Sequence, residues 1–468
     1  MLLLEAALML LPLAVSLIYG ESCSLSFVIS AAAAAVVGAA LKFFCRSDSK
    51  NLYTRDGLAI VALSWIGISL FGALPFVISG SIPSFIDAFF ETVSGFTTTG
   101  ASILTDVEAL SHGLLFWRSF THWVGGMGVL VFIMAVMEKT PERSVNILRA
   151  EMPGHNVDKL TPRASGTAKI LYYIYLALTV LETVLLLCGG MPLFDSIVHA
   201  LGTAGTGGFG IKADSIASYS HFCQWVITVF MLLFGVSFNM YYLLLIKRWR
   251  EVLKSNELKC YLGISLAAMI IVVLSIMPLY GSIADAVRLS AFQVSSIVTT
   301  TGYATADFDA WPSLAKAVLL ILMFFGGCMG STAGGLKMSR VTVLAQIARN
   351  DLRHALRPRE VSTVILNGRR VDAQGERQIL SYFALYIAVI GAVFLLISFE
   401  PFGIETNFSA TVSCVNNIGP GFGQVGPSLS YADYSAFSKL VLSFAMLLGR
   451  LEIYPLLLLL SPQLWTKR

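Results

Sequence analysis

The pattern of apolar and polar positions divides the chain into long apolar runs separated by polar loops. Ten apolar runs approach 20 residues, the length that a helix needs to cross the hydrocarbon core of a bilayer. They lie at residues 2–19, 24–44, 57–79, 114–137, 168–188, 222–246, 260–279, 313–336, 378–398 and 436–460. Four shorter apolar runs, at 84–97, 193–205, 285–299 and 405–416, are too short to cross. The pattern therefore predicts ten transmembrane helices and four re-entrant half-helices.

Each short run leads into a stretch of threonine, asparagine or glycine, and the four stretches align on one glycine. The two clear copies are FETVSGFTTTGA at Phe90–Ala101 and FQVSSIVTTTGYA at Phe292–Ala304. The two weaker copies are VHALGTAGTGGF at Val198–Phe209 and SATVSCVNNIGP at Ser409–Pro420. The aligned glycines, which recur roughly every hundred residues, are Gly100, Gly208, Gly302 and Gly419. This recurrence predicts four repeated units.

The repeats predict an all-α membrane protein of four pseudosymmetric units, each a span, a half-helix, a loop and a second span, around a central pore. Two extra N-terminal spans precede them. The expected divisions are an N-terminal helix pair at 1–50, then units at 51–145, 146–255, 256–350 and 351–468, with the last span of the third unit broken.

Backbone without hydrogen-bond partners survives at membrane depth only where it lines water or coordinates a ligand. Four such loops around one axis would offer carbonyl oxygens to a dehydrated cation, and glycine permits the close approach. The candidate ion-selecting residues are Thr97, Thr98, Thr99 and Gly100 in the first unit, Gly205, Thr206, Gly207 and Gly208 in the second, Thr299, Thr300, Thr301 and Gly302 in the third, and Asn416, Asn417, Ile418 and Gly419 in the fourth.

The eighth apolar run contains a dense group of glycines, FGGCMGSTAGGLK at Phe325–Lys337. Each glycine costs a helix up to about 1 kcal/mol relative to alanine, so the span is expected to break into two pieces around an irregular loop beneath the filter. The candidate gate residues there are Gly326, Gly327, Gly330, Ser331, Thr332, Gly334 and Gly335. A close helix-packing surface through Gly326 and Gly330 is the alternative.

Charged residues inside apolar runs are costly and usually functional. Arg450, in the last span, is the main candidate: it either faces the pore and pins the glycine-rich loop or pairs with a carboxylate such as Glu452. Residues that are two positions apart on a helix do not face each other, which argues against pairing between Arg450 and Glu452. The pattern leaves the roles of Lys337, Glu91 and Glu182 open.

Composition and charge agree with a polytopic membrane protein. The chain has 468 residues, is 56% hydrophobic and 13% charged, and has a mean hydropathy of +0.75. Most of its lysine and arginine lies in loops 45–56, 138–169, 247–259 and 340–377, which predicts that these loops and both termini are cytoplasmic. The same bias explains the basic stretch 340–377 without nucleic acid; anionic lipid or a cytosolic protein is the expected contact.

Several motifs together resemble the Trk/Ktr/HKT superfamily of potassium transporters, and its TrkH branch most. The motifs are TTTGAS at 97–102, HWVGGMG at 122–128, GTGGFG at 205–210, TTTGYATADF at 299–308, GSTAGGLK at 330–337 and NNIGPGFG at 416–423. The match runs from about residue 50 to the end, and the two leading spans fit the TrkH branch.

The resemblance implies a K⁺-selective pore, with K⁺ as transported ion and no organic cofactor in this chain. It also implies a homodimer, a cytosolic nucleotide-binding regulatory subunit of the TrkA kind and a bacterial inner membrane. It assigns the four glycines to the filter, 326–335 to a gating loop and Arg450 to the gate. Gly100, where plant sodium-transporting relatives have serine, favours K⁺. GTGG and NNIG lack the threonine triplet, so the four segments are not expected to be equivalent.

The sequence thus predicts a potassium uptake channel or transporter subunit and not an enzyme, since it shows no paired carboxylates or histidine cluster at membrane depth. One alternative is an ion-coupled symporter (Na⁺ or H⁺) of inverted-repeat design, which would have interrupted helices in both halves, whereas the sequence predicts one interrupted span. The other alternative is a non-conducting membrane sensor or scaffold.

Overall fold

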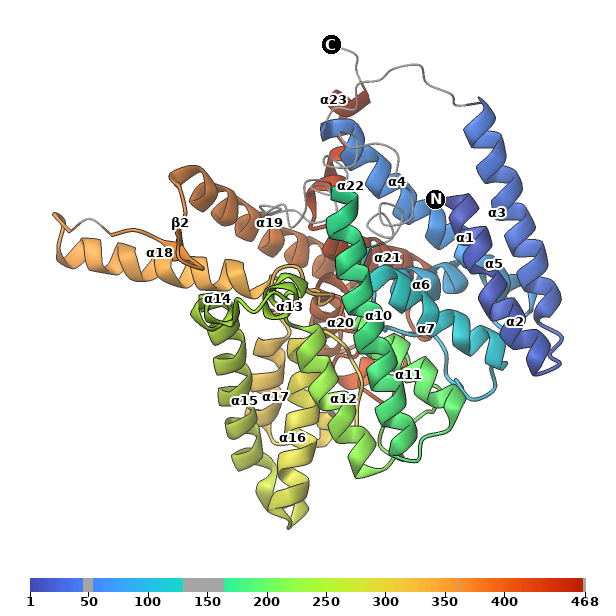
Figure 1. The fold of residues 1–468 in the computed structure, drawn as a ribbon, viewed down its shortest axis with the longest axis horizontal. Coiled ribbons are helices and arrows are strands. Elements are labelled where there is room, and N and C mark those ends of the chain that lie inside the picture. Colours follow the sequence, from blue (N-terminus) through green and yellow to red (C-terminus); the bar gives the residue numbers. More distant parts are fainter. Residues whose placement is uncertain (45–53, 129–163, 361, 466–468) are drawn as a thin grey trace.

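The structure, a computed structural model, describes residues 1–44, 54–128, 164–360 and 362–465 (Figure 1). The described chain is helical apart from one small antiparallel hairpin of β1 (Ile365–Leu366) and β2 (Arg369–Arg370). The prediction of an all-α fold is confirmed. The predicted domain boundaries at residues 50 and 145 lie outside the described residues, and the one at 350 lies within α18 (Met338–Leu356).

Five described helices are long and apolar enough to cross a membrane, and a sixth candidate is a bent pair. They are α3 (Ser24–Phe44), α4 (Thr54–Gly72) continued by α5 (Leu74–Ile78), α10 (Ala164–Cys188), α15 (Asn256–Tyr280) and α19 (Ala373–Ile397). Each coincides with a predicted span. The total of ten spans stays a prediction, and the second half of the fourth expected span, 129–137, lies outside the described residues.

The expectation of a single interrupted span is wrong. The sixth predicted span consists of α12 (His221–Phe234) and α13 (Phe238–Leu245), which are bent by 91°. The eighth is α17 (Ser313–Leu322), followed by non-helical backbone up to α18. The tenth is α21 (Ala436–Arg450) and α22 (Tyr454–Leu459). Interruption therefore no longer argues against a symporter.

Four short helices lie between the longer ones and are buried along most of their length. They are α6 (Phe85–Phe96), α11 (Leu193–Gly205), α16 (Ile283–Val298) and α20 (Ile404–Asn416). In three cases the longer helix that follows a short helix packs against the next short helix: α7 (His112–Gly126) on α11, α12 on α16, and α21 back on α6. Across the remaining seam, Lys316 of α17 binds Glu405 of α20 at 2.9 Å. The packing closes a ring.

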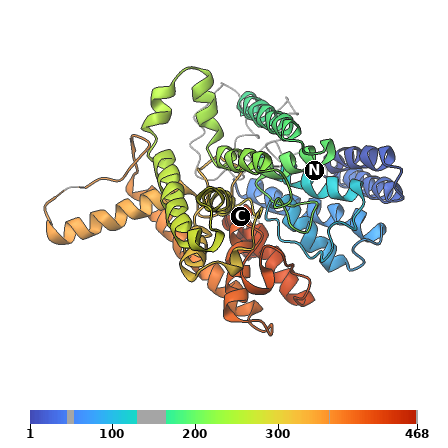
Figure 2. The same ribbon diagram turned by 90° about the horizontal axis from the view of Figure 1, so that it is seen from below.

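The remaining helices lie outside this ring. Both views place α1 (Leu2–Leu8), α2 (Leu10–Ile18) and α3 on one side of the molecule, whereas α18 projects from the opposite side (Figures 1 and 2). Short helices α14 (Trp249–Lys254) and α23 (Pro462–Trp465), and the 3-10 turns η1 (Phe308–Ala310) and η2 (Gly423–Val425), complete the described chain.

Candidate functional site

The four short helices end in the same backbone turn. The first or second residue after each helix has left-handed backbone, with φ between 55° and 57°: Thr98, Thr206, Thr300 and Asn417. Two residues later comes a glycine with φ of 79° at Gly100, 76° at Gly208, 86° at Gly302 and 104° at Gly419. The weaker sequence copies, GTGG and NNIG, thus adopt the same conformation as the two TTTG copies.

Hydrogen bonds fix each turn as a helix C-cap. The N–H between the left-handed residue and the glycine bonds to the carbonyl five residues back, at 2.8–3.0 Å: Thr99 to Ser94, Gly207 to Gly202, Thr301 to Ser296 and Ile418 to Ser413. This long-range bond characterises the Schellman motif, which uses up carbonyls of the last helical turn. The carbonyls that follow are left outside the helical pattern.

These following carbonyls lie against the glycine of a neighbouring segment. A Cβ built on Gly100 would lie 2.0 Å from the carbonyl oxygen of Gly207, and one on Gly208 would lie 2.0 Å from that of Thr301. A Cβ on Gly302 would lie 2.1 Å from the carbonyl oxygen of Ile418, and one on Gly419 would lie 2.7 Å from that of Thr99. The contacts run from unit to unit and return to the first, forming what we call the carbonyl ring. Only glycine fits at the four positions, since real Cβ contacts below 3.0 Å are essentially absent.

The four ring oxygens, of Thr99, Gly207, Thr301 and Ile418, accept no hydrogen bond from any residue that the structure describes. A buried carbonyl without a partner costs free energy, so these oxygens are suited to bind something else. A vestibule of about 260 Å³ opens on this level, and Gly100, Gly208, Gly302 and Gly419 all line it. The ring is therefore reached from one side by a hollow in the protein.

A buried ion pair supports the first two segments. Glu91 of α6 accepts from Nε of Arg118 at 2.8 Å and from the N–H of Ile103 at 3.0 Å. The guanidinium also donates to the carbonyl of Gly210 at 3.2 Å and stacks on Phe209 at 4.1 Å. Glu91 therefore anchors its half-helix and the adjacent loop. Sequence reasoning missed Arg118, although a charge inside the apolar run 114–137 was the signal for it.

Two side chains connect segments of the carbonyl ring that are distant in the sequence. The amide of Asn417 donates to Thr99 Oγ1 at 3.0 Å and to the carbonyl of Met446 at 2.9 Å. The hydroxyl of Tyr303 donates to the carbonyl of His199 in α11 at 3.2 Å. The first contact joins the fourth segment to the first, and the second joins the third segment to the second unit.

The glycine-rich backbone between α17 and α18 lies directly beneath the ring. Its Gly334 N–H donates to Thr300 Oγ1 at 2.7 Å, and a Cβ on Gly334 would lie 2.4 Å from the carbonyl oxygen of Asn416. Gly326 and Gly335 form an antiparallel bridge that closes the loop on itself. The loop thus contacts both the third and the fourth segments.

The break between α12 and α13 supports the far side of the loop. The carbonyl of Gly235 accepts from Cys328 N–H at 2.8 Å, and Phe238 N–H donates to the carbonyl of Gly330 at 3.0 Å. Glu257 of α15 accepts from Met329 N–H at 2.6 Å. The unpaired backbone at one helix break is therefore satisfied by that at the other.

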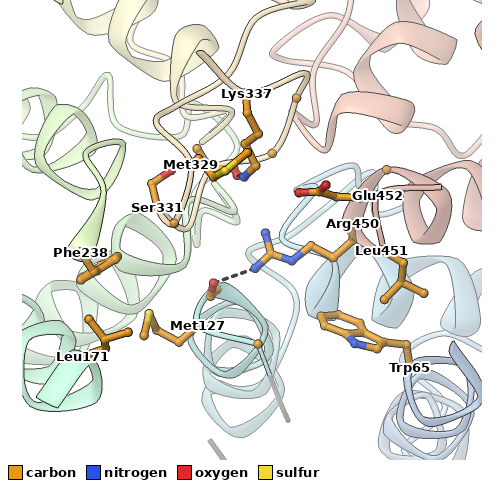
Figure 3. A pocket seen from close by; sticks show the side chains of 17 residues that line it. Trp65, Met127, Leu171, Phe238, Met329, Ser331, Lys337, Arg450, Leu451 and Glu452 are labelled. Atoms are coloured by element: carbon orange, nitrogen blue, oxygen red, sulfur yellow. Dashed lines mark hydrogen bonds between the residues drawn. The ribbon is translucent and has the colours of Figure 1, made fainter. Parts of the chain in front are cut away.

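Arg450, the last residue of α21, reaches the loop from the opposite direction. It donates to the carbonyl of Thr332 at 2.8 Å and to that of Gly126, at the end of α7, at 2.7 Å. Figure 3 shows its side chain crossing the cavity toward α7, with Met329 and Ser331 of the loop nearby. The cavity measures about 80 Å³ and is lined by the loop, Met127, Phe238 and Arg450.

The other charged candidates have defined positions. Glu452 forms an ion pair with Arg340 of α18. The amine of Lys337 donates back into the loop, to the carbonyl of Ala333, so it is directed toward the loop. Glu182 is fully buried in α10, and neither of its carboxyl oxygens has a hydrogen-bond partner among the described residues.

Known proteins are similar to this chain over nearly its whole length. A model of the TrkH family, described as cation transport proteins, matches residues 24–467. The Trk system potassium uptake protein TrkH of Salmonella typhimurium is 34% identical over 98% of this chain and 95% of the relative. TrkG of Escherichia coli K12, also a Trk system potassium uptake protein, is 33% identical over the same shares. The crystal structure of the potassium transporter TrkH from Vibrio parahaemolyticus superposes with a TM-score of 0.90 at 33% identity, covering 99% of this chain and 97% of that one. The relatives are ion transporters, which confirms the prediction that the chain is not an enzyme.

Proposed function

The chain belongs to the TrkH family of cation transport proteins, and from this premise we propose that it takes up K⁺ through the carbonyl ring. The observation that carries the proposal is the set of four oxygens, of Thr99, Gly207, Thr301 and Ile418, that face neighbouring glycines and accept no hydrogen bond from described residues. Backbone carbonyls of this kind replace the hydration shell of a dehydrated cation. The relatives named as potassium uptake proteins support K⁺ as the ion.

The membrane potential supplies the driving force in this proposal. Moving one charge through 100 mV yields about 2.3 kcal/mol, so uptake needs no chemical reaction in this chain. The short helices direct their C-terminal ends at the ring, and the negative end of a helix dipole favours a cation there. Filter residues 97–100, 205–208, 299–302 and 416–419 form the selective region.

The glycine-rich loop 326–335 and Arg450 gate the pathway in this proposal. The loop lies beneath the ring through Gly334, and Arg450 holds it through the carbonyl of Thr332. A guanidinium is permanently charged, so at this place it both fixes the loop and repels a passing cation. Opening requires the loop and Arg450 to separate.

The proposal includes the surroundings expected from the family: a homodimer in a bacterial inner membrane with both termini in the cytoplasm, contact with lipid, and a cytosolic nucleotide-binding regulatory subunit of the TrkA kind. Its support is that the relatives are named as parts of a Trk system. Co-purification of the chain with such a subunit tests this part.

Uptake of ⁸⁶Rb⁺ into proteoliposomes tests transport. An inside-negative potential is imposed with a proton ionophore and an outward proton gradient, and protein-free liposomes are the control. We expect potential-driven uptake that unlabelled K⁺ inhibits at lower concentration than Na⁺. Uptake that requires a Na⁺ or H⁺ gradient at a fixed potential would establish the symporter alternative, and no uptake by folded protein would favour a sensor or scaffold.

A further inference from the structure

The carbonyl of Gly419 differs from those of the other three filter glycines. It accepts one hydrogen bond from Ser413 Oγ at 2.8 Å and a second from the hydroxyl of Tyr431 at 2.8 Å. A carbonyl oxygen has two lone pairs, so both are in use. The carbonyls of Gly100, Gly208 and Gly302 accept no hydrogen bond from the residues that the structure describes.

The residue six positions before the glycine accounts for part of this difference. In the third unit, the hydroxyl of Ser296 bonds to the carbonyl of Tyr303, at 2.6 Å, and passes over the glycine. In the first unit, Ser94 Oγ is buried and has no partner in the described chain. In the second unit the position is Gly202, which has no hydroxyl. Only Ser413 holds the glycine carbonyl itself.

Tyr431 is itself held in place. Its side chain is buried among Phe90, at 5.5 Å between ring centroids, and Tyr434, at 5.9 Å. Its N–H donates to the carbonyl of Ser102, just beyond the first filter segment, at 2.8 Å. Tyr431 thus bridges the first and fourth segments. Gly419 is buried, whereas the other three filter glycines are partly exposed.

We propose that Tyr431 is a specificity-determining residue: together with Ser413 it holds the Gly419 carbonyl, so that the glycine level of the filter offers an ion three free carbonyl oxygens. This inference rests on the proposed function. The number and field strength of the coordinating carbonyls are properties on which K⁺/Na⁺ discrimination depends. Tyr431 touches no ion; it acts through the carbonyl that it occupies.

Tyr431→Phe removes one hydrogen-bond donor and keeps the aromatic ring. Ser413→Ala removes the other donor without altering the aromatic packing. Each change frees one lone pair of the Gly419 oxygen, which then becomes a fourth ligand. Because a larger ion accommodates more ligands, we expect discrimination to move toward K⁺. The Na⁺ concentration that halves ⁸⁶Rb⁺ uptake should rise at least threefold in each variant, and further in the double variant.

Tyr434→Phe is the matched control. The aromatic ring of Tyr434 stacks beside that of Tyr431, and its hydroxyl donates to Asn407 Oδ1 at 2.8 Å and not to the filter carbonyl. It should keep the wild-type competition by Na⁺. A second measurement is the unfolding temperature of purified protein in KCl and in NaCl, because an ion that binds only the folded state stabilises it by mass action. The difference between the two salts should grow in Tyr431→Phe and Ser413→Ala.

Unchanged competition in both Tyr431→Phe and Ser413→Ala, or a shift toward Na⁺, would overturn the inference. The same shift in Tyr434→Phe would also overturn it, because the effect would then be one of general packing. Failure of the proposed function is distinguishable: in that case the wild-type protein itself would show neither ⁸⁶Rb⁺ uptake nor a K⁺-specific rise in unfolding temperature.

Discussion

Gly302→Ser is the substitution whose effect the carbonyl ring defines most directly. At Gly302 the new Cβ would lie 2.1 Å from the carbonyl oxygen of Ile418 and 3.0 Å from Cδ of Pro420. The oxygen has to retreat by ~1 Å to restore van der Waals contact, since Cβ contacts under 3.0 Å are essentially not observed. A ring oxygen is thereby displaced from the place where it would meet an ion.

The size of the effect has two parts. Left-handed backbone with a side chain, at φ 86°, costs about 1–3 kcal/mol of stability. Coulomb energy falls with inverse distance, so an oxygen moved ~1 Å from a contact of ~3 Å loses about a quarter of its attraction for the ion. We expect K⁺/Na⁺ discrimination to fall about tenfold, which is about 1.4 kcal/mol.

Gly190→Ser separates the two parts. Gly190 has nearly the same φ, 84°, but a Cβ there would meet nothing within 4 Å. Both variants should lose stability in thermal unfolding, Gly302→Ser the more because its Cβ also overlaps the Ile418 oxygen, and only Gly302→Ser should change the Na⁺ competition measured by ⁸⁶Rb⁺ uptake. Unchanged competition in Gly302→Ser, or an equal change in Gly190→Ser, would refute the assignment of the Ile418 oxygen to the ion pathway.

Three further substitutions test other contacts. Arg450→Ala removes the bonds to Thr332 and Gly126 and should raise basal ⁸⁶Rb⁺ flux severalfold; equal or lower flux in well-folded protein would count against gating. Glu91→Gln breaks the buried pair with Arg118 and should cost about 3 kcal/mol, read as a lower unfolding temperature; an unchanged temperature would contradict the anchoring role. Burial opposes ionisation of Glu21, but hydrogen bonds from the N–H groups of Gly113 and His112 outweigh it and lower its pKa. A lowered pKa stabilises the fold above the ordinary carboxyl pKa of about 4.3, and this stabilisation is lost as pH falls through the lowered value. Glu21→Gln should therefore lower the unfolding temperature at pH 7 and make that temperature fall less steeply as the solution is acidified. An unfolding temperature with the same pH dependence as the wild type would argue against stabilisation by ionised Glu21.

Local sequence patterns predicted much of the backbone structure of this protein. The spacing of the four glycines located four turns whose backbone is the same, including the two that lack the threonine triplet. The glycine density at 326–335 marked non-helical backbone at the break of a helix. These predictions rest on short-range physics: a left-handed turn needs glycine or a tolerant residue, and closely spaced glycines weaken a helix.

The sequence did not predict the helix break between α12 and α13, because contacts with a distant segment stabilise it. The 91° bend between α12 and α13 contains the short sequence GVS and no proline; its free backbone groups are satisfied by Cys328 and Gly330 of the loop. No local pattern signals a break that a distant segment stabilises.

The sequence by itself determined the membrane character, the four-fold repeat of glycines and the place of the irregular loop, because each follows from apolar length or from the conformational freedom of glycine. The tertiary structure alone decided which carbonyl faces which glycine, that Glu91 pairs with Arg118, and that Tyr431 and Ser413 occupy the oxygen of Gly419. Those contacts join separate elements of the fold. Hydrophobic periodicity specifies the face that a helix buries, whereas the partner of a polar group depends on how the helices pack around the ring.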